Sequence, residues 1–461
     1  MSLPRTLGAL AQACGGVLHG ADRAFSGVSI DTRTLQPGEL FVALRGPRFD
    51  GAQFLSAALA RGAAGALLEG IQPLALAQIT VPDALQALQR AAQAWRAALP
   101  IPVVGVAGSN GKTTTKEMTA SILRQRGACL ATHGNLNNHI GVPLTLLRLE
   151  MAHRSAVIEM GTNRPGEVAE LVRIARPTVA LITNAGAEHL EGFLTLEGVA
   201  RAEGEAVAGL EDTATAVLNA DDAFFDLWRG MTRARVVSFG LSARADFRAS
   251  EPRTRLTSTG FSTQFTLSCP LGRAPIELRL GGRHNVLNAL AAAAAAAGAG
   301  ADLAAIGAGL AAVSPVSGRL QPERTAGGAW ILDDSYNANP SSVRSGIEVL
   351  AACAGRRWLV LGDMAELGAA AADAHAEIGV FAREQGIERL YATGALTALA
   401  VERFGAGGRW FPQIEALIEA VHAALEEAGA DVLILVKGSR INRLERVVRA
   451  LTGGAARPEG H

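Results

Sequence analysis

The residues best suited to chemistry form a glycine-rich segment, G-S-N-G-K-T-T, from Gly108 to Thr114. An apolar run at 103–107 precedes it, and a helical pattern, K-E-M-T-A-S-I-L-R, follows it. Glycines let backbone N–H groups turn toward a phosphate, and the N-terminus of a helix adds partial positive charge. In such a loop Lys112 reaches the β and γ phosphates of ATP, and the Thr113 hydroxyl binds Mg²⁺. The segment therefore predicts an ATP-binding phosphate loop.

The spacing of this loop departs from the strict pattern G-x-x-x-x-G-K-[ST]. Val106 stands where the first glycine belongs, and the segment follows G-x-x-G-x-x-G-K-T from Gly105. A glycine-rich turn with an incidental lysine is the alternative interpretation, but the strand before and the helix after favour the ATP site. The expected ATP contacts in this loop are Gly108, Ser109, Asn110, Gly111, Lys112, Thr113 and Thr114.

Two further polar residues follow apolar runs that read as strands. Glu159 ends A-V-I-E, and His189 follows V-A-L-I-T-N in the string N-A-G-A-E-H-L. Open α/β sheets bind their ligands at the carboxyl ends of the strands, so both residues are expected near the phosphate loop. Mg²⁺ prefers oxygen ligands, which suits Glu159 better than His189. Taken alone, His189 is more typical of a hydrogen-bonded loop histidine.

The elements that would position these residues alternate along most of the chain. Short β-branched runs are followed by Ala/Leu-rich helical patterns, which is typical of parallel sheets covered by helices. Strands are expected at 102–107, 156–160, 179–183, 216–219, 358–361 and 432–436. The segment 253–280 differs, because Thr, Phe and Leu alternate with polar residues around Gly260 and Gly272. This alternation predicts antiparallel strands inserted into the α/β pattern.

The chain length of 461 residues predicts two to four domains. Proline-containing connecting segments at 100–102 and 314–318 divide the chain into domains 1–99, 100–313 and 314–461. The fold class is α/β: a small N-terminal α/β domain, a central ATPase-type domain with a mostly parallel sheet, and a C-terminal Rossmann-like domain. The phosphate loop belongs to the central domain.

Composition limits the partners of the chain. Lys plus Arg and Asp plus Glu both total 43, which disfavours a basic nucleic-acid or membrane-surface binder. The hydrophobic content of 49% excludes a disordered chain. Four widely separated cysteines suggest neither disulfides nor a thiolate zinc site, and they favour the cytoplasm. The apolar stretch 289–301 is too short to span a bilayer, and Gln12 interrupts the first apolar run, which predicts an ordinary helix there.

The string G-x-x-G-x-x-G-K-T-T resembles the phosphate loop of the Mur ligases, ATP-dependent amide-forming enzymes of bacterial cell-wall precursor synthesis. The resemblance extends to T-H-G-N-L-N-N-H-I-G-V-P (132–143), D-D-S-Y-N-A-N-P (333–340), L-G-D-M-A-E-L-G (361–368) and K-G-S-R (437–440). These strings are similar to those of the member that adds D-alanyl-D-alanine. The resemblance implies a ligase that uses ATP and Mg²⁺, and we expect a monomer in the cytoplasm, although the sequence itself carries no signal for the oligomeric state. The ligase would join D-alanyl-D-alanine to UDP-N-acetylmuramoyl-tripeptide through an acyl phosphate, with small-molecule substrates only.

The resemblance also assigns the metal and catalytic residues. Together with Thr113, Glu159 and His189 would hold the metal ions, and Lys112 would stabilise the transferred phosphoryl group. Most relatives place a carbamylated lysine where this chain has Glu203 in V-A-R-A-E-G-E-A. We hypothesise that Glu203 substitutes through a bridging water, or that the second metal binds more weakly here. A solvated glutamate on a helix is the alternative.

The remaining contacts implied by the resemblance lie in all parts of the chain. His284, Asn285 and Asn288 would meet adenine or ribose, although Asn285 is also a good N-cap. Arg319 would contact the nucleotide phosphates, Asp334 the ribose or a metal-bound water, and Tyr336 and Asn337 the base. The substrate and dipeptide side would include Asn137, Asn138, Lys437 and Arg440. The UDP contacts would be Ser29, Thr32, Arg33, Arg45, Asp50 and Gly51, where surface ion pairs are the alternative for Arg33 and Arg45.

The division of these residues between two domains predicts a conformational step. The phosphate loop lies in the central domain and Lys437 in the last one, so closure would complete the site and exclude water from the acyl phosphate. We expect an open form without nucleotide and a hinge at 314–318. The alternatives are another amino-acid-adding member, whose D-N-P-R string is absent here, and a catalytically silent scaffold signalled by Glu203.

Overall fold

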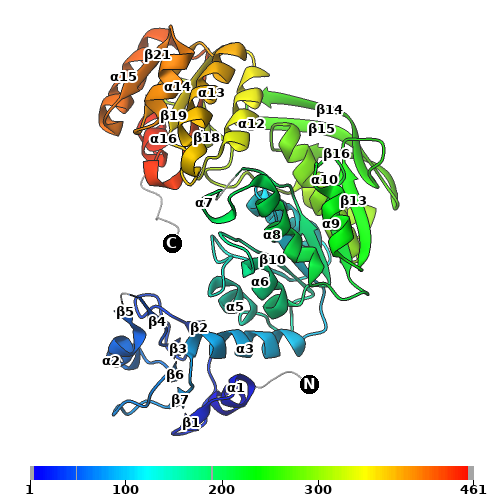
Figure 1. Cartoon of the computed structure of the whole chain (residues 1–461), viewed down its shortest axis with the longest axis vertical. Coiled ribbons are helices and arrows are strands. Elements are labelled where there is room, and N and C mark those ends of the chain that lie inside the picture. The colour runs from blue at the N-terminus through cyan, green and yellow to red at the C-terminus, as the bar shows by residue number, and fades with distance from the viewer. Residues whose placement is uncertain (1–4, 48, 188–189, 455–461) are drawn as a thin grey trace.

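The computed structural model describes residues 5–47, 49–187 and 190–454 (Figure 1). Its three main sheets follow one another along the chain, within residues 17–80, 103–278 and 321–437. The middle and last sheets are mostly parallel and carry helices. The α/β class and the parallel-rich central sheet are therefore confirmed. The domain boundaries at 99/100 and 313/314 stay predictions.

The first sheet has five strands in the order β1-β7-β6-β3-β2, and only the β1–β7 pair is antiparallel. Leu7 and Leu10 of the first helix are buried in the apolar core, so that segment is an ordinary helix as expected. A small hairpin, β4–β5, stands apart from the sheet. The elements are α1 (Leu7–Cys14), β1 (Val17–His19), β2 (Val28–Ser29), β3 (Leu40–Val42), β4 (Arg45–Gly46), β5 (Phe49–Asp50), α2 (Leu55–Ala60), β6 (Gly65–Leu68), β7 (Gln78–Thr80) and α3 (Ala84–Ala97).

The middle sheet has nine strands in the order β16-β15-β14-β13-β12-β11-β8-β10-β9. It is parallel from β9 to β14, and β14, β15 and β16 pair antiparallel, which confirms the prediction for 253–280. The strands are β8 (Val103–Ala107), β9 (Cys129–Ala131), β10 (Ser155–Glu159), β11 (Val179–Ile182), β12 (Thr215–Asn219), β13 (Arg235–Gly240), β14 (Phe247–Thr257), β15 (Gly260–Cys269) and β16 (Gly272–Leu278). The helices are α4 (Lys112–Arg124), α5 (Gly141–Leu146), α6 (Glu167–Ala175), α7 (Leu190–Phe193), α8 (Leu196–Ala208), α9 (Phe225–Met231), α10 (Arg283–Gly298) and α11 (Leu303–Ala311).

The last sheet has six strands in the order β17-β18-β22-β19-β20-β21, and only β17 runs antiparallel to its neighbour. The strands are β17 (Gln321–Arg324), β18 (Trp330–Asp334), β19 (Arg356–Gly362), β20 (Arg389–Thr393), β21 (Gly408–Phe411) and β22 (Val432–Lys437). The helices are α12 (Pro340–Ala351), α13 (Ala371–Glu384), α14 (Thr397–Phe404), α15 (Ile414–Ala428) and α16 (Glu445–Thr452). The carboxyl ends of β18, β22 and β19 therefore lie side by side.

The alanine-rich helix α10 lies inside the middle domain. The residues from Ala289 to Ala296 are at most 1% exposed, because the helix contacts α4 on one side and β12, β13 and β14 on another. A helix that is apolar all round is expected to be buried, and small side chains allow the close approach. None of the helices in the described residues has the length and apolar character that a bilayer span requires.

The antiparallel hairpin β14–β15 also reaches the last domain. Phe261 of β15 is 3% exposed and packs in a core cluster with Leu320 and Ile347. Figure 1 shows the hairpin extending toward α12. The last domain is thus attached to the middle one by the chain at 314–318 and by this packed hairpin end.

Candidate active site

The phosphate loop connects β8 to α4 and requires glycine at two positions. Gly108 and Gly111 have φ of 114° and 82°. A Cβ atom on Gly108 would lie 2.1 Å from Thr183 Oγ1, and one on Gly111 would lie 2.3 Å from Asn288 Oδ1. Because any other side chain would be strained and would clash, these glycines set both the curvature of the loop and its contact with α10.

Lys112 lies in the first turn of α4, and its Nζ donates to the carbonyl oxygens of Gly108 and Ser109. It lines a cavity of about 340 Å³, called here the reaction cavity. Thr113 and Glu159 line the same cavity from the middle domain, and Lys437 lines it from the last domain. The structure therefore brings Lys112, Thr113 and Glu159, which were predicted for phosphate and metal chemistry, into one cavity with Lys437, which was predicted for the substrate and dipeptide side.

The loop is fixed to the segment that follows β11. Ser109 N–H donates to Asn184 O at 2.9 Å, Asn110 N–H donates to Asn184 Oδ1 at 3.1 Å, and Gly186 N–H donates to Ser109 Oγ at 2.8 Å. Our sequence analysis missed Asn184. Its position directly after a strand, at the same edge of the sheet as Glu159, could have indicated it.

Glu159 ends β10 and is 3% exposed. Its Oε1 accepts a hydrogen bond from Asn137 Nδ2 at 2.9 Å, whereas Oε2 is buried without a hydrogen-bond partner among the described residues. Lys116 Nζ lies 3.9 Å from that Oε2. A buried carboxylate oxygen that lacks a donor and lines a cavity is suited to a hard cation.

The donors present suit Mg²⁺ only in combination with substrate and water. Within the described part of the chain, no group of three or more His, Cys, Asp or Glu side chains is arranged to hold a metal ion. Mg²⁺ usually binds one or two protein oxygens and takes its other ligands from water and phosphate, so Thr113 and Glu159 fit that pattern. His189, the third predicted ligand, lies outside the described residues.

Lys116 is a site residue that the sequence analysis missed. It is 1% exposed, and its Nζ donates to Thr132 O at 2.7 Å and lies 3.0 Å from Glu117 Oε1. Thr132 Oγ1 in turn accepts the N–H of Glu159 at 3.0 Å. The sequence carried no signal, because a lysine one turn into a helix reads as a solvated residue.

Glu203 lies on α8 and is 1% exposed. Its Oε2 accepts the backbone N–H of Gly108 at 2.6 Å. The alternative of a solvated helix glutamate is therefore wrong, because the carboxylate is buried against the phosphate loop. Participation of Glu203 in metal binding stays a prediction.

A second cavity of about 340 Å³, called here the nucleotide cavity, lies between α10 and α12. The predicted residues that line it are Asn110, Gly111, Thr114, His284, Asn285, Asn288, Arg319, Asp334 and Lys437. Asn219 and Phe239 also line it and were missed, although Asn219 ends β12. Asn285 is not an N-cap: α10 begins at Arg283 after Gly282, and Asn285 Nδ2 donates to Gly281 O at 2.7 Å.

The protonation of His284 is set by its surroundings in this cavity. Burial lowers its pKa from 6.5 to about 4, Lys437 adds to the lowering, and Asp334 opposes it. The ring is therefore neutral at pH 7. A neutral imidazole offers one donor and one acceptor, which is what recognition of a heterocycle or a ribose hydroxyl requires.

Tyr336 and Asn337 line the reaction cavity, not the nucleotide cavity, which contains His284. The Arg319 guanidinium lies over the Tyr336 ring, 4.2 Å from its centroid. We expected Tyr336 and Asn337 beside the base, and the structure instead places them in the cavity that the phosphate loop lines. Asn339 follows in the same string and caps α12 by accepting the N–H of Ser342.

The last domain contributes a buried cation to both cavities. Lys437 is 3% exposed, and its Nζ lies 2.6 Å from Asp334 Oδ2 and donates to Asn337 O at 3.0 Å. Arg440 differs, because its side chain is 54% exposed, approaches Glu445 at 3.9 Å and lines neither cavity. Asn138 lines the reaction cavity, where its Oδ1 also accepts the N–H groups that begin α5.

The phosphate loop touches the last domain directly. Asn110 Nδ2 donates to Ser341 Oγ at 3.1 Å, and Asn339 Nδ2 donates to Asn110 Oδ1 at 2.8 Å. The structure therefore describes a form in which the two domains meet at the site. The expected open form without nucleotide stays a prediction.

The residues predicted for UDP binding lie in the first domain and line neither cavity. Arg33 pairs with Asp31 at 2.6 Å, and Arg45 pairs with Asp50 at 2.8 Å, so both make the surface ion pairs named as their alternative role. Ser29 ends β2 and Thr32 follows it. Gly51 leaves no room for a side chain, since a Cβ would lie 2.6 Å from Leu44 O. Their role in binding stays a prediction.

A phosphate loop at the carboxyl edge of a parallel sheet, covered by a second α/β domain, defines the class of nucleotide-binding α/β enzymes with a site between domains. Three family models match the chain: "Mur ligase family, catalytic domain" at 24–96, "Mur ligase middle domain" at 106–296 and "Mur ligase, glutamate ligase domain" at 318–440. The chain belongs to the Mur ligase family.

Named relatives match nearly the whole chain. The UDP-N-acetylmuramoyl-tripeptide–D-alanyl-D-alanine ligase of Escherichia coli (strain K12) is 44% identical over 97% of this chain and 98% of its own. The Bacillus subtilis (strain 168) enzyme of the same name is 35% identical over 92% and 93%. A crystal structure of MurF from Acinetobacter baumannii covers 98% of this chain and 99% of its own, at 31% identity and a TM-score of 0.91. A MurF ligase from Thermotoga maritima in complex with ADP has 26% identity, a TM-score of 0.80 and coverage of 93% and 97%.

Proposed function

We propose that this protein is an ATP-dependent ligase that joins D-alanyl-D-alanine to UDP-N-acetylmuramoyl-tripeptide. The products are UDP-N-acetylmuramoyl-pentapeptide, ADP and phosphate, in the synthesis of peptidoglycan precursors. The observation that carries the proposal is the reaction cavity, in which Lys112, Glu159 and Lys437 meet from two domains. The name shared by the relatives supports the choice of substrates.

The proposed reaction has two steps, because a carboxylate is a poor acceptor for an amine. The γ-phosphoryl group of ATP first moves to the terminal carboxylate of the tripeptide and gives an acyl phosphate and ADP. The amine of the dipeptide then attacks the acyl carbon, the C–O bond to phosphate breaks, and the amine loses a proton. Both steps place negative charge on phosphoryl and carboxyl oxygens, so the protein acts by electrostatic stabilisation.

The residues of the middle domain would provide that stabilisation. Lys112 would exchange its contacts with the loop carbonyls for the phosphoryl oxygens, and the loop N–H groups would hold the β-phosphate. Thr113, Glu159 and His189 would hold Mg²⁺, which neutralises charge on the phosphates when it is bound. Asn137 would hold Glu159 through its Oε1, leaving Oε2 for the cation.

The nucleotide would lie in the nucleotide cavity, with adenine or ribose against neutral His284, Asn285 and Asn288. Arg319 would contact the phosphates, and Asp334 would meet the ribose or a metal-bound water. Because Arg319 and Asp334 come from the last domain, closure would seal the acyl phosphate from water. Tyr336, Asn337 and Lys437 would face the reacting groups, and Asn138 would lie on the substrate side. Arg440 would meet the dipeptide only after a change of its exposed rotamer.

The UDP group would bind to the first domain through Ser29, Thr32, Arg33, Arg45, Asp50 and Gly51. The substrates of the protein are small molecules, and we propose that the protein acts as a monomer in the cytoplasm. All four cysteines are free thiols, in keeping with a reducing compartment.

Glu203 raises a separate test. We propose that its carboxylate, which accepts the Gly108 N–H at 2.6 Å, serves without modification where relatives use a carbamylated lysine. Turnover would then be independent of CO₂. Degassed, bicarbonate-free buffer should leave the rate unchanged, and a rate that falls and returns with bicarbonate would contradict the substitution.

The direct test of function is coupled phosphate release with purified protein, UDP-tripeptides ending in diaminopimelate or lysine, acceptors with shorter peptides, and a panel of dipeptides and single amino acids. We expect release to require ATP, a UDP-tripeptide and D-alanyl-D-alanine together. Release with a single amino acid and a shorter acceptor would instead identify another amino-acid-adding Mur ligase. Nucleotide binding with no release under any combination would identify a silent scaffold.

A further inference from the structure

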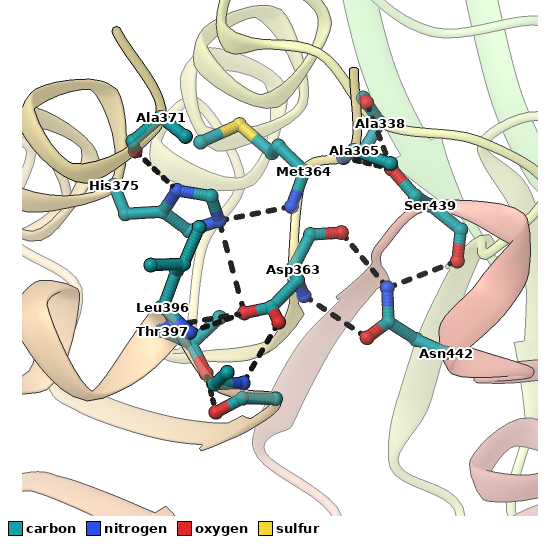
Figure 2. Close-up of polar contacts among 12 residues, drawn as sticks. Ala338, Asp363, Met364, Ala365, Ala371, His375, Leu396, Thr397, Ser439 and Asn442 are labelled. Atoms are coloured by element: carbon teal, nitrogen blue, oxygen red, sulfur yellow. Dashed lines mark hydrogen bonds and ion pairs between the residues drawn. The ribbon is translucent and has the colours of Figure 1, made fainter. Parts of the chain in front are cut away.

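The string L-G-D-M-A-E-L-G at 361–368 has no role in the proposed chemistry, although it lies beside the site. Its aspartate, Asp363, follows β19 directly and lines neither cavity. Figure 2 shows Asp363 at the centre of a network of polar contacts that includes Ser439 and Asn442. We call Asp363, Ser439 and Asn442 the loop clamp.

The carboxylate of Asp363 anchors this clamp to the start of α14. It accepts the backbone N–H groups of Ala395 at 2.8 Å and of Leu396 and Thr397 at 3.0 Å each. Gly394 is required beside it, because a Cβ there would lie 2.4 Å from Asp363 Cγ. Three N–H donors at a helix N-terminus hold a carboxylate firmly, so Asp363 is a fixed point of the domain.

The backbone of Asp363 in turn fixes the loop after β22. Asn442 Oδ1 accepts the N–H of Asp363 at 3.1 Å, and Asn442 Nδ2 donates to the carbonyl oxygens of Asp363 at 2.8 Å and Ser439 at 3.0 Å. Ser439 N–H donates to Asp363 O at 3.0 Å. These contacts use both the oxygen and the nitrogen of the asparagine amide, so a side chain without both groups cannot make all of them.

The hydroxyl of Ser439 connects a third loop. It donates to Ala338 O at 3.1 Å and accepts the N–H of Ala365 at 2.8 Å. Ala338 belongs to the loop after β18, and Ala365 belongs to the loop after β19. The clamp therefore links the loops that leave β18, β19 and β22 at one edge of the sheet.

Two of these loops carry or directly follow residues of the reaction cavity. Lys437 stands two positions before Ser439, and Asn337 and Asn339 flank Ala338. Asn339 makes the contact with Asn110 of the phosphate loop at 2.8 Å. The positions of Lys437 and Asn339 relative to the phosphate loop thus depend on the clamp.

We propose that Asp363, Ser439 and Asn442 are positioning residues for the ligase reaction. They act through Lys437 and Asn339 and do not touch the substrates. A misplacement of about 1 Å at a reacting centre costs about 100-fold in rate, so a loosened clamp should lower kcat while the fold survives. This inference rests on the proposed function in one respect, because turnover is one of its two readouts.

The first experiment compares Asn442→Ala and Ser439→Ala with wild type in the coupled assay. We expect kcat to fall about 10- to 100-fold for Asn442→Ala and less for Ser439→Ala. The KM for UDP-tripeptide should stay within about twofold, because the first domain is unchanged. The control is Asp302→Ala, which removes a comparable cap contact, to Ala305 N–H at the start of α11, and lines neither cavity. It should leave kcat unchanged.

A purely structural role predicts a different result. The proposal would be overturned by clamp variants whose melting temperature is lower but whose kcat equals that of wild type. It would also be overturned if their kcat fell no more than that of Asp302→Ala. If Asn442→Ala fails to fold, Ser439→Ala still decides, since it removes one hydroxyl and leaves the backbone contact to Asp363 intact.

The second readout does not depend on activity. Hydrogen–deuterium exchange at the amides of Ala365 and Ser439 should accelerate about tenfold in Asn442→Ala and stay unchanged in Asp302→Ala. Unchanged exchange at both amides would overturn the clamp even in an active enzyme. A wild-type protein without turnover would contradict the proposed function alone, and the exchange experiment would still test the clamp.

Discussion

The middle and first domains both hold candidate binding residues, but they hold them in opposite ways. In the middle domain Lys116 is 1% exposed and Glu159 is 3% exposed, and their partners are fixed backbone and side-chain groups. In the first domain the Arg33 side chain is 78% exposed and pairs with Asp31 two residues away. Charges in a dry, preorganised site act strongly, whereas exposed charges are screened by water and salt. Substitutions should therefore have large effects in the middle domain and small ones in the first.

The largest effect is expected from Lys112→Ala. Loss of its ammonium group should lower turnover by at least about 1,000-fold. The reason is that Lys112 is proposed to stabilise the negative charge that develops on the transferred phosphoryl group. Circular dichroism and the melting temperature should stay close to wild type. Arg124→Ala, at the exposed end of the same helix, is the matched control and should retain full rate. Appreciable residual activity in Lys112→Ala would contradict the assigned role.

Lys116→Met should mainly affect stability. The variant leaves the buried Glu159 carboxylate without its neighbouring cation and Thr132 O without its donor. Breaking a buried pair in this way costs about 3 kcal/mol in the free energy of unfolding. Chemical denaturation measures this loss. Mg²⁺ with nucleotide should raise the melting temperature of the variant more than that of wild type, because it restores positive charge beside Glu159. Equal shifts would disprove that account.

His284 should make stability depend on pH. Because its pKa is lowered by burial from 6.5 to about 4, its contribution is complete above pH 6.5 and is lost as the pH falls toward 4. A shift of that size is worth about 3 kcal/mol. Denaturation of wild type and His284→Asn between pH 7 and 4 should show a slope that the variant lacks. Parallel curves would mean that the ring is solvated.

The smallest effect is expected in the first domain. Arg33→Ala should raise the KM for UDP-tripeptide about tenfold and leave kcat unchanged, as for one exposed contact to an anionic substrate. Arg23→Ala, another arginine of that domain, is the control. If KM does not change, the ion pair with Asp31 is the whole role of Arg33, and the contrast between the two domains becomes sharper.

The predictions from sequence succeeded where the structure is local. The phosphate loop, the strands around it and the antiparallel insertion depend on neighbours in the chain, so their patterns were readable. Lys116 and Glu203 were different: their burial depends on how α4 and α8 pack against the sheet, which no short pattern encodes. Asn285 was wrong as an N-cap because α10 begins two residues earlier, after Gly282 in a conformation that glycine favours.

The hairpin end that carries Phe261 has a mechanical consequence. A rigid body attached at two points keeps one free rotation, about the line that joins those points. Once the contacts of Asn110 with Ser341 and Asn339 are broken, the points are the connection at 314–318 and the core cluster that Phe261 shares with Leu320 and Ile347. Strand β21, at the edge of its sheet remote from β17, should travel farthest in that rotation, and Leu320 should scarcely move. Energy transfer between fluorophores on β21 and the first domain would therefore change with the motion, whereas energy transfer between a pair beside Phe261 would not change.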